Sequence, residues 1–196
     1  MLDLGSGTFR LVLFGYGPGR SFQLLDELRE AVALGEGLSR GRIAEGALER
    51  GKKALRAFAD FLQALAPEET LVLATSAVRD AENGQGVVEE AVRLGLAPRV
   101  LTGEEEARLG VLAVANALPL EAAWWWTREG SAQVSLMEGR RFRWGRALPL
   151  GALRLTEAFL PSDPPKKGEV RALERAVEGH LRSSPWRGAC PGGPRG

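Results

Sequence analysis

Cysteine and histidine are almost missing from this chain. The 196 residues contain one cysteine, Cys190, and one histidine, His180. A single cysteine excludes an internal disulfide framework, and these two residues cannot make a zinc cluster. The N-terminus leads directly into an expected strand, without the pattern of a secretory signal. We therefore expect a cytoplasmic protein.

Long apolar runs and a strong excess of one charge are also missing. No apolar run approaches the roughly 20 residues that cross a bilayer, so no membrane partner is expected. The net charge of +1 gives no reason to expect nucleic acid as a partner. An apolar content of 44% with mixed charges is typical of a globular protein, with one large domain or two small ones.

The opening stretch DLGSGTFRLVLF combines an acidic residue, two glycines and two hydroxyls between two expected strands. Glycines let backbone N–H groups turn towards an anion, and hydroxyls add donors. The carboxylate of Asp3 can hold a hydrated cation beside a bound phosphate. The alternative is an ordinary hairpin turn, with Arg10 as a solvated strand residue. The candidate phosphate-binding residues here are Gly5, Ser6, Gly7, Thr8 and Arg10.

Periodicity predicts alternating strands and helices over residues 1–118. This order predicts an N-terminal α/β phosphate-binding domain, with ligands at the C-terminal ends of its strands. The first strand is short, and we suspect that the true start lies upstream. Beyond a strand start at the N-terminus, the expected strands are 9–16, 21–28, 71–74 and 98–101, and the expected helices are 42–65, 77–81, 87–94 and 102–117.

Residues 119–181 are interpreted as a partial, truncated second α/β domain. It should hold strands at 122–126, 133–137 and 142–148, and helices at 151–159 and 169–181. Residues 182–196 lack periodicity and are rich in glycine, proline and arginine. They are expected to be an aberrant or disordered tail.

Two later loops carry further candidates. Arg79 lies one turn into a helix that follows hydroxyls at a strand end, where it could contact an anion or be exposed beside a helix cap. Glu105 fits a capping box with Thr102, and it is also a candidate general base. One of Glu105 and Glu106 could cap the helix while the other faces a cleft.

Three stretches, in order and spacing, resemble the exopolyphosphatase / guanosine pentaphosphate phosphohydrolase (Ppx/GppA) phosphatase family: DLGSGTFRLVLF, LATSAVRDAENG and VLTGEEEARLGVLAVANAL. The segments around 33–62 and 146–165 fit as well. The resemblance implies an actin/Hsp70/sugar-kinase-like (ribonuclease H-like) fold, with two α/β domains and a cleft. It also implies hydrolysis of terminal phosphate from inorganic polyphosphate or guanosine pentaphosphate (pppGpp), with Mg²⁺ as cofactor.

The resemblance assigns roles to single residues. Asp3 resembles a metal ligand, and residues 5–10 resemble the first phosphate loop, although Gly7-Thr8 stands where many members have Asn-Ser or Asn-Thr. Arg79 resembles a phosphate-contacting arginine, and Glu105 resembles the catalytic base. At the end of a second phosphate loop, Gly130 matches the last glycine, and Ser131-Ala132-Gln133 match the residues that follow it. Gly130 and Ser131 are its candidate phosphate-binding residues.

The second phosphate loop departs from the family pattern. Trp126 stands where a metal-holding aspartate belongs, and Arg128 and Glu129 replace glycines, so their side chains would block the approach of a phosphate to the backbone. We interpret this stretch as a reading-frame shift, because a run of TGG codons read one base earlier gives valines followed by Asp-x-Gly-Gly. The same shift turns the tail into a Gly-Gly-Thr-like sequence. A clean read of the locus in the printed frame would refute this hypothesis.

The sequence thus predicts an exopolyphosphatase or pppGpp phosphohydrolase-type enzyme, and the disrupted second loop leaves open whether the chain as printed is active or inactive. The alternative is a non-catalytic module that binds polyphosphate or the alarmone. An intact Asp-x-Gly-Gly-Gly would favour the enzyme, and the printed loop favours the binding module. A kinase-like relative is a weaker option. The sequence does not separate the two substrates, and it leaves a homodimer open.

Overall fold

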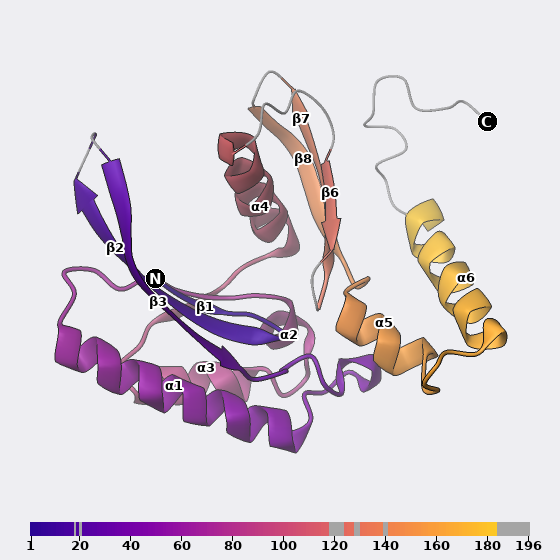
Figure 1. Ribbon diagram of the computed structural model, residues 1–196, viewed down its shortest axis with the longest axis horizontal. Helices are drawn as coiled ribbons and strands as arrows, with labels where there is room; N and C mark the ends of the chain where they lie inside the picture. Colours follow the sequence, from indigo (N-terminus) through magenta and orange to yellow (C-terminus); the bar gives the residue numbers. More distant parts are fainter. Residues whose placement is uncertain (18, 20, 118–123, 128–129, 139–140, 184–196) are drawn as a thin grey trace. The chain divides into compact units, whose positions relative to one another are not determined.

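The computed structural model describes residues 1–17, 19, 21–117, 124–127, 130–138 and 141–183 (Figure 1). The chain divides into two compact units, Met1–Leu101 and Thr102–Gly196. Among the residues described, no helix is long and apolar enough to cross a membrane.

The first unit is built on a five-stranded mixed sheet with the order β3-β2-β1-β4-β5. Its strands are β1 (Leu2–Leu4), β2 (Thr8–Gly17), β3 (Ser21–Ala31), β4 (Val72–Ala74) and β5 (Pro98–Val100). The first three strands pair antiparallel, whereas β1, β4 and β5 run parallel. The C-terminal ends of the three parallel strands therefore lie at one edge of the sheet.

Two of the helices of this unit, α1 (Glu45–Leu65) and α3 (Gln85–Arg93), pack against each other and share one core with the sheet (Figure 1). The buried face of α1 lies against this core, and Gly51 on that face leaves room for Leu34, whose Cδ2 would lie 3.2 Å from an added Cβ. Large side chains in this core are fully buried, and each contributes roughly 1.5–3 kcal/mol relative to exposure. Among them are Leu2, Leu4, Phe9, Leu34, Leu55 and Val72.

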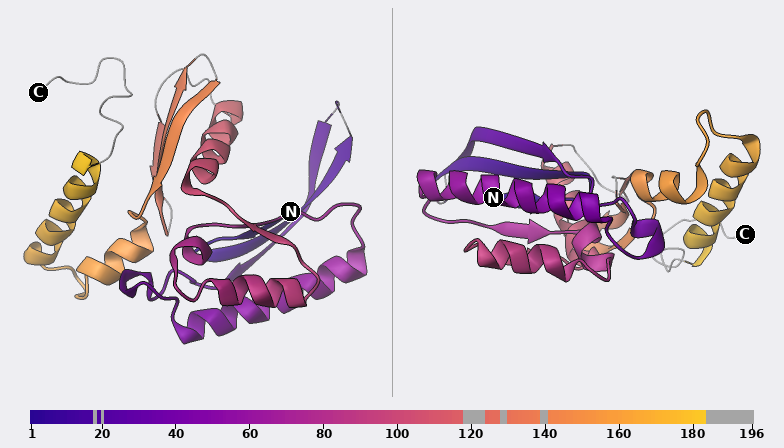
Figure 2. Two further views of the ribbon diagram at one scale, coloured as in Figure 1. Left: turned by 180° about the vertical axis from the view of Figure 1, so that it is seen from behind. Right: turned by 90° about the horizontal axis from the view of Figure 1, so that it is seen from below.

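The connections complete this unit. A short 3₁₀ helix, η1 (Leu38–Arg40), precedes α1, and α2 (Ser76–Asp80) follows β4 directly. The β2–β3 hairpin extends beyond the rest of the sheet (Figure 2), because both strands continue after the pairing of β2 with β1 has ended. The rings of Phe14 and Phe22 meet edge to face on this hairpin, with centroids 5.8 Å apart.

The second unit contains a three-stranded antiparallel sheet with the order β6-β7-β8. Its strands are β6 (Trp124–Thr127), β7 (Ala132–Glu138) and β8 (Arg141–Leu148), and α4 (Gly103–Ala117) packs along β7 and β8 (Figure 1). Two further helices, α5 (Ala152–Phe159) and α6 (Lys167–Ser183), pack against each other.

The predicted order of strands and helices is confirmed where the structure describes it. The expected helix at 42–65 begins three residues later, because Ala44 is extended with φ −63° and ψ 145°. Residues 182–183, expected in the tail, end α6 instead. Residues 184–196, and with them the rest of the predicted tail, lie outside the described residues.

The division between the units differs from the predicted boundary at 118. The structure places it after Leu101, so α4 belongs to the second unit. The physical reason is the apolar face of α4: Val111 and Ala115 share a core cluster with Met137, and Phe142 packs against it. This face is covered by the three-stranded sheet.

Candidate active site

The turn between β1 and β2 follows a tight backbone path. A Cβ atom at Gly5 would lie 2.8 Å from the carbonyl oxygen of Thr8, so this position requires glycine. The Oγ atoms of Ser6 and Ser76 are 2.8 Å apart, and the two residues are only 5% and 2% exposed. Ser76 is the first residue of α2, so the loops that follow the neighbouring strands β1 and β4 meet at two buried hydroxyls.

The segment that follows β3 in the same unit binds the carbonyl groups of this turn. The amide of Gly35 donates to the carbonyl oxygen of Ser6 at 2.8 Å, and the amides of Val32 and Ala33 donate to that of Gly7 at 3.0 and 2.8 Å. Two carbonyl groups of the turn are therefore used by the protein itself. This leaves the amide and hydroxyl donors of the turn as the groups suited to an anion.

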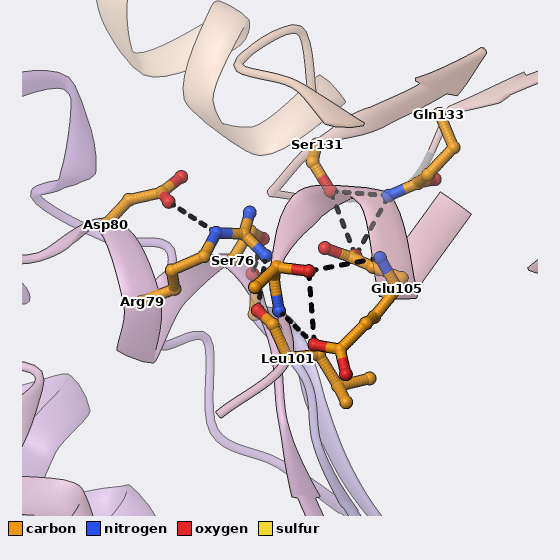
Figure 3. Close-up of polar contacts among 10 residues, drawn as sticks. Ser76, Arg79, Asp80, Leu101, Glu105, Ser131 and Gln133 are labelled. Atoms are coloured by element: carbon orange, nitrogen blue, oxygen red, sulfur yellow. Dashed lines mark hydrogen bonds and ion pairs between the residues drawn. The ribbon is translucent and has the colours of Figure 1, made fainter. Parts of the chain in front are cut away.

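Arg79 links α2 to the end of β5. Its Nε donates to Oδ1 of Asp80 at 2.9 Å, and its Nη1 donates to the carbonyl oxygen of Leu101 at 3.1 Å (Figure 3). The side chain is 23% exposed. The guanidinium is thus placed near the C-terminal ends of the parallel strands, where the sequence predicts a ligand. Its contact with phosphate stays a prediction.

Asp3 and Arg10 are cross-strand neighbours on β1 and β2. Arg10 forms an ion pair with Glu27, which also accepts a hydrogen bond from Arg29 at 2.6 Å. Hydrogen bonds from Arg29 and then Arg10 hold the pKa of Glu27 below its usual value. The Arg10 side chain is 42% exposed. This ion pair favours the solvated-strand alternative for Arg10, and its contact with phosphate stays a prediction.

The donor set can be tested against the expected Mg²⁺. In the described part of the chain, no group of three or more His, Cys, Asp and Glu side chains could hold a metal. A cage of protein ligands is therefore not seen there. Mg²⁺ needs no such cage, because it usually takes one or two carboxylates together with water and substrate phosphate oxygens. Asp3 supplies a ligand of the right chemistry, and its metal role stays a prediction.

Glu105 forms the capping box with Thr102, which was one of the two roles that the sequence allowed for it. Its Oε2 accepts hydrogen bonds from the amide and the hydroxyl of Thr102 at 2.9 and 3.1 Å, and its own amide donates to the Thr102 hydroxyl at 3.2 Å (Figure 3). These reciprocal bonds satisfy donors at the start of α4. The carboxylate of Glu105 is thus hydrogen-bonded to Thr102 at the start of α4. Its catalytic role stays a prediction.

The next acid, Glu106, points instead to the predicted second phosphate loop. Its Oε1 accepts hydrogen bonds from Gln133 Nε2 at 2.9 Å and Ser131 Oγ at 3.2 Å, and Gln133 also donates to Ser131 at 2.7 Å (Figure 3). Ser131 and Gln133 are 2% and 3% exposed, and Gly130 is buried. The Oε1 atom of Gln133 is buried without a hydrogen-bond partner among the described residues. This cluster joins the start of α4 to the start of β7.

The family resemblance matched Gln133 to the end of the second phosphate loop but gave it no role in the site. It stands two positions after Ser131, which places its side chain on the same face of β7. Ser135 continues this face and donates to the carbonyl oxygen of Ala107 at 3.1 Å, which fixes α4 on the strand. The match of Ser131-Ala132-Gln133 to the end of the second phosphate loop was the signal that could have selected Gln133.

The strand before the second loop is present. Trp126 pairs with Gln133, and Thr127 pairs with Ala132. Arg128 and Glu129 lie outside the described residues. The expectation that these two side chains block a phosphate therefore stays a prediction.

The fold and these loops define an α/β protein of the actin/Hsp70/sugar-kinase-like class, with candidate anion-binding loops at the ends of its strands. The same fold is seen in the PilM–PilN type IV pilus biogenesis complex, at a TM-score of 0.57 and 16% identity. Residues 15–192 match the model of the Ppx/GppA phosphatase family. The chain belongs to this family.

Curated and solved relatives support this assignment. Exopolyphosphatase 1 of Mycobacterium tuberculosis is 31% identical over an alignment of 186 residues that covers 92% of this chain and 54% of that protein. The crystal structure of an exopolyphosphatase from Cytophaga hutchinsonii matches at 25% identity and a TM-score of 0.83, over 92% of this chain and 59% of that one. A Ppx/GppA family member from Aquifex aeolicus matches at 29% identity and a TM-score of 0.68, over 92% and 60% of the two chains. The chain thus spans about half the length of the curated relatives it matches.

Proposed function

We propose that this chain carries the phosphate-handling part of a phosphoanhydride hydrolase that releases terminal phosphate from inorganic polyphosphate, with pppGpp as the second candidate substrate. The observation that carries the proposal is the meeting of the Gly5–Thr8 turn with the start of α2, where the Ser6 and Ser76 hydroxyls touch. Relatives named as exopolyphosphatases support the substrate class.

In this proposal, fixed donors balance the charge of the phosphate. Backbone amides of the Gly5–Thr8 turn would bind phosphate oxygens, and Arg79 would add a charged donor. Asp3 would hold Mg²⁺, which when bound would neutralise further phosphate charge. On the second unit, Ser131 would be the corresponding hydroxyl of the second phosphate loop.

We assign the general base to Glu106 rather than to Glu105. Glu106 is oriented by Ser131 and Gln133, two side chains of the predicted second loop. Glu105 is held by Thr102 of its own helix terminus. A base must reach the attacking water next to the phosphate, so the carboxylate that contacts the phosphate loop is the better candidate.

Phosphate release from long-chain polyphosphate and from pppGpp tests the proposal. Glu106→Gln should lower the turnover rate about 100-fold or more, because general bases contribute roughly 10²–10⁴-fold. Glu105→Gln is the matched control, since glutamine can still complete a capping box. It should retain most of the activity. The opposite ranking would return the base to Glu105, and equal release from all three proteins would remove both.

A non-catalytic module is the second candidate function. Trp126 occupies the strand position where the family resemblance places an acidic residue, and this favours binding without turnover. Calorimetric titration with tripolyphosphate separates the two. Saturable binding without phosphate release from either substrate would support the binding module and overturn the hydrolase for this chain.

A further inference from the structure

One amide side chain binds both backbone groups of a residue 40 positions away. Oδ1 of Asn83 accepts a hydrogen bond from the amide of Ile43 at 2.8 Å, and its Nδ2 donates to the carbonyl oxygen of Ile43 at 2.9 Å. The adjacent amide of Glu82 donates to the carbonyl oxygen of Gly41 at 3.0 Å. We call the two Asn83–Ile43 bonds the Asn83 clamp.

The clamp joins the α2–α3 connection to the segment 32–44. That segment is bonded to the phosphate turn at its other end, through the amides of Val32, Ala33 and Gly35. It is also closed on itself, because the amide of Ala44 donates to the carbonyl oxygen of Glu36 at 2.8 Å. A displacement of this segment at Ile43 would therefore be transmitted to the Gly5–Thr8 turn.

On the other side of the clamp, the α2–α3 connection packs closely against the backbone of α2. A Cβ atom at Gly84 would lie 2.0 Å from the carbonyl oxygen of Val78, so the chain passes α2 at close range. The same helix begins at Ser76 and carries Arg79 on its next turn. Asn83 therefore holds the element that bears the candidate phosphate arginine.

These contacts form a closed ring. The Ser6–Ser76 hydroxyl pair closes it on one side, and the Asn83 clamp closes it on the other. We propose that Asn83 is a positioning residue, which fixes Arg79 relative to the Gly5–Thr8 turn so that both engage the same phosphate group. This inference rests on the proposed function of the turn and Arg79. A purely stabilising loop contact is the competing explanation.

Binding of inorganic tripolyphosphate to the full chain separates these explanations. Asn83→Ala should weaken the affinity about tenfold, a size typical of residues coupled through one network. In an Arg79→Ala background the same substitution should have little further effect, because the arginine that it positions is gone. Gln85→Ala removes an exposed amide side chain two residues away and should leave the affinity unchanged. Equal factors in both backgrounds would overturn the positioning role.

Amide hydrogen exchange without ligand provides a readout that does not depend on phosphate binding. In Asn83→Ala, the amides of Val32, Ala33 and Gly35 should exchange faster, with wild-type exchange in the middle of α1. Wild-type rates at these three amides would overturn the inference even if the protein binds phosphate. Absence of tripolyphosphate binding in the wild type would overturn the proposed function, and the exchange result would still decide whether the clamp fixes the turn.

Discussion

Gly84 and Gly86 are two positions apart, but a side chain would be crowded at Gly84 and would meet open space at Gly86. Gly84 has helical dihedral angles, with φ −61° and ψ −29°, but an added Cβ would lie 2.0 Å from the Val78 carbonyl oxygen. No atom lies within 4 Å of a Cβ at Gly86. Gly84→Ala should therefore destabilise the protein by about 1–3 kcal/mol or more, through steric overlap with backbone. Gly86→Ala should stabilise it by up to about 1 kcal/mol, because alanine is the better helix former.

Urea unfolding of both variants checks this pair. The same substitution at neighbouring sites controls for the loss of glycine flexibility in the unfolded chain. A neutral Gly84→Ala variant would contradict the close passage of the connection over α2, on which the positioning role of Asn83 also depends.

At the level of single residues, the contacts of a side chain could be predicted from the sequence where its partner lies within the same short motif. Thr102 and Glu105 are three residues apart, so their capping box could be written down in advance. Asn83 and Ile43 are 40 residues apart, and in the sequence Asn83 lies only in the gap between the expected helices 77–81 and 87–94. The choice between Glu105 and Glu106 likewise needed the position of Ser131, because neighbouring acids on a helix point in different directions.

On α3, a buried carboxylate binds two arginines. Glu90 accepts hydrogen bonds from Arg93 Nη2 at 2.6 Å and from Arg56 Nε of α1 at 3.0 Å. These bonds, first that of Arg93, lower the pKa of Glu90 below 4.5. A carboxylate whose pKa is lowered by folding stabilises the protein above the unfolded pKa, and this contribution is lost as the pH falls through the folded pKa.

Glu90→Gln should therefore lower the free energy of unfolding at neutral pH, and the difference from wild type should shrink as the pH falls below 4.5. Chemical unfolding over a pH series gives both quantities. Glu89→Gln, at an exposed neighbouring position, removes the same charge without these partners and is the control. A constant difference between Glu90→Gln and wild type at all pH values would show that the lost contact is not ionic.

The placement of α4 shows what periodicity leaves undecided at the level of elements. The sequence identified a helix ending near Ala117, but it could not say which sheet would cover its apolar face. Gly145 on β8 settles this packing, because a Cβ there would lie 3.0 Å from the Cβ of Ala107. Such a close approach depends on a residue far along the chain and leaves no periodic signal in the helix itself.

For the molecule as a whole, the two units have separate cores. Leu55 is fully buried in the core of the first unit, and Met137 is 1% exposed in a cluster of the second. All five tryptophans come after residue 101 in the sequence and so belong to the second unit; the first of them is Trp124. The single tyrosine, Tyr16, belongs to the first unit. Tryptophan fluorescence therefore reports on the second unit alone, and far-ultraviolet circular dichroism reports on both.

Leu55→Ala should destabilise the first unit by about 2–5 kcal/mol, the usual cost of an emptied core position. We expect the circular-dichroism transition to move to lower urea while the tryptophan transition stays in place. Met137→Ala is the reciprocal variant, and it should move the tryptophan transition because Met137 packs under α4 in the second unit. If both probes shift together in both variants, the two cores unfold as one cooperative system, and the division after Leu101 does not separate them energetically.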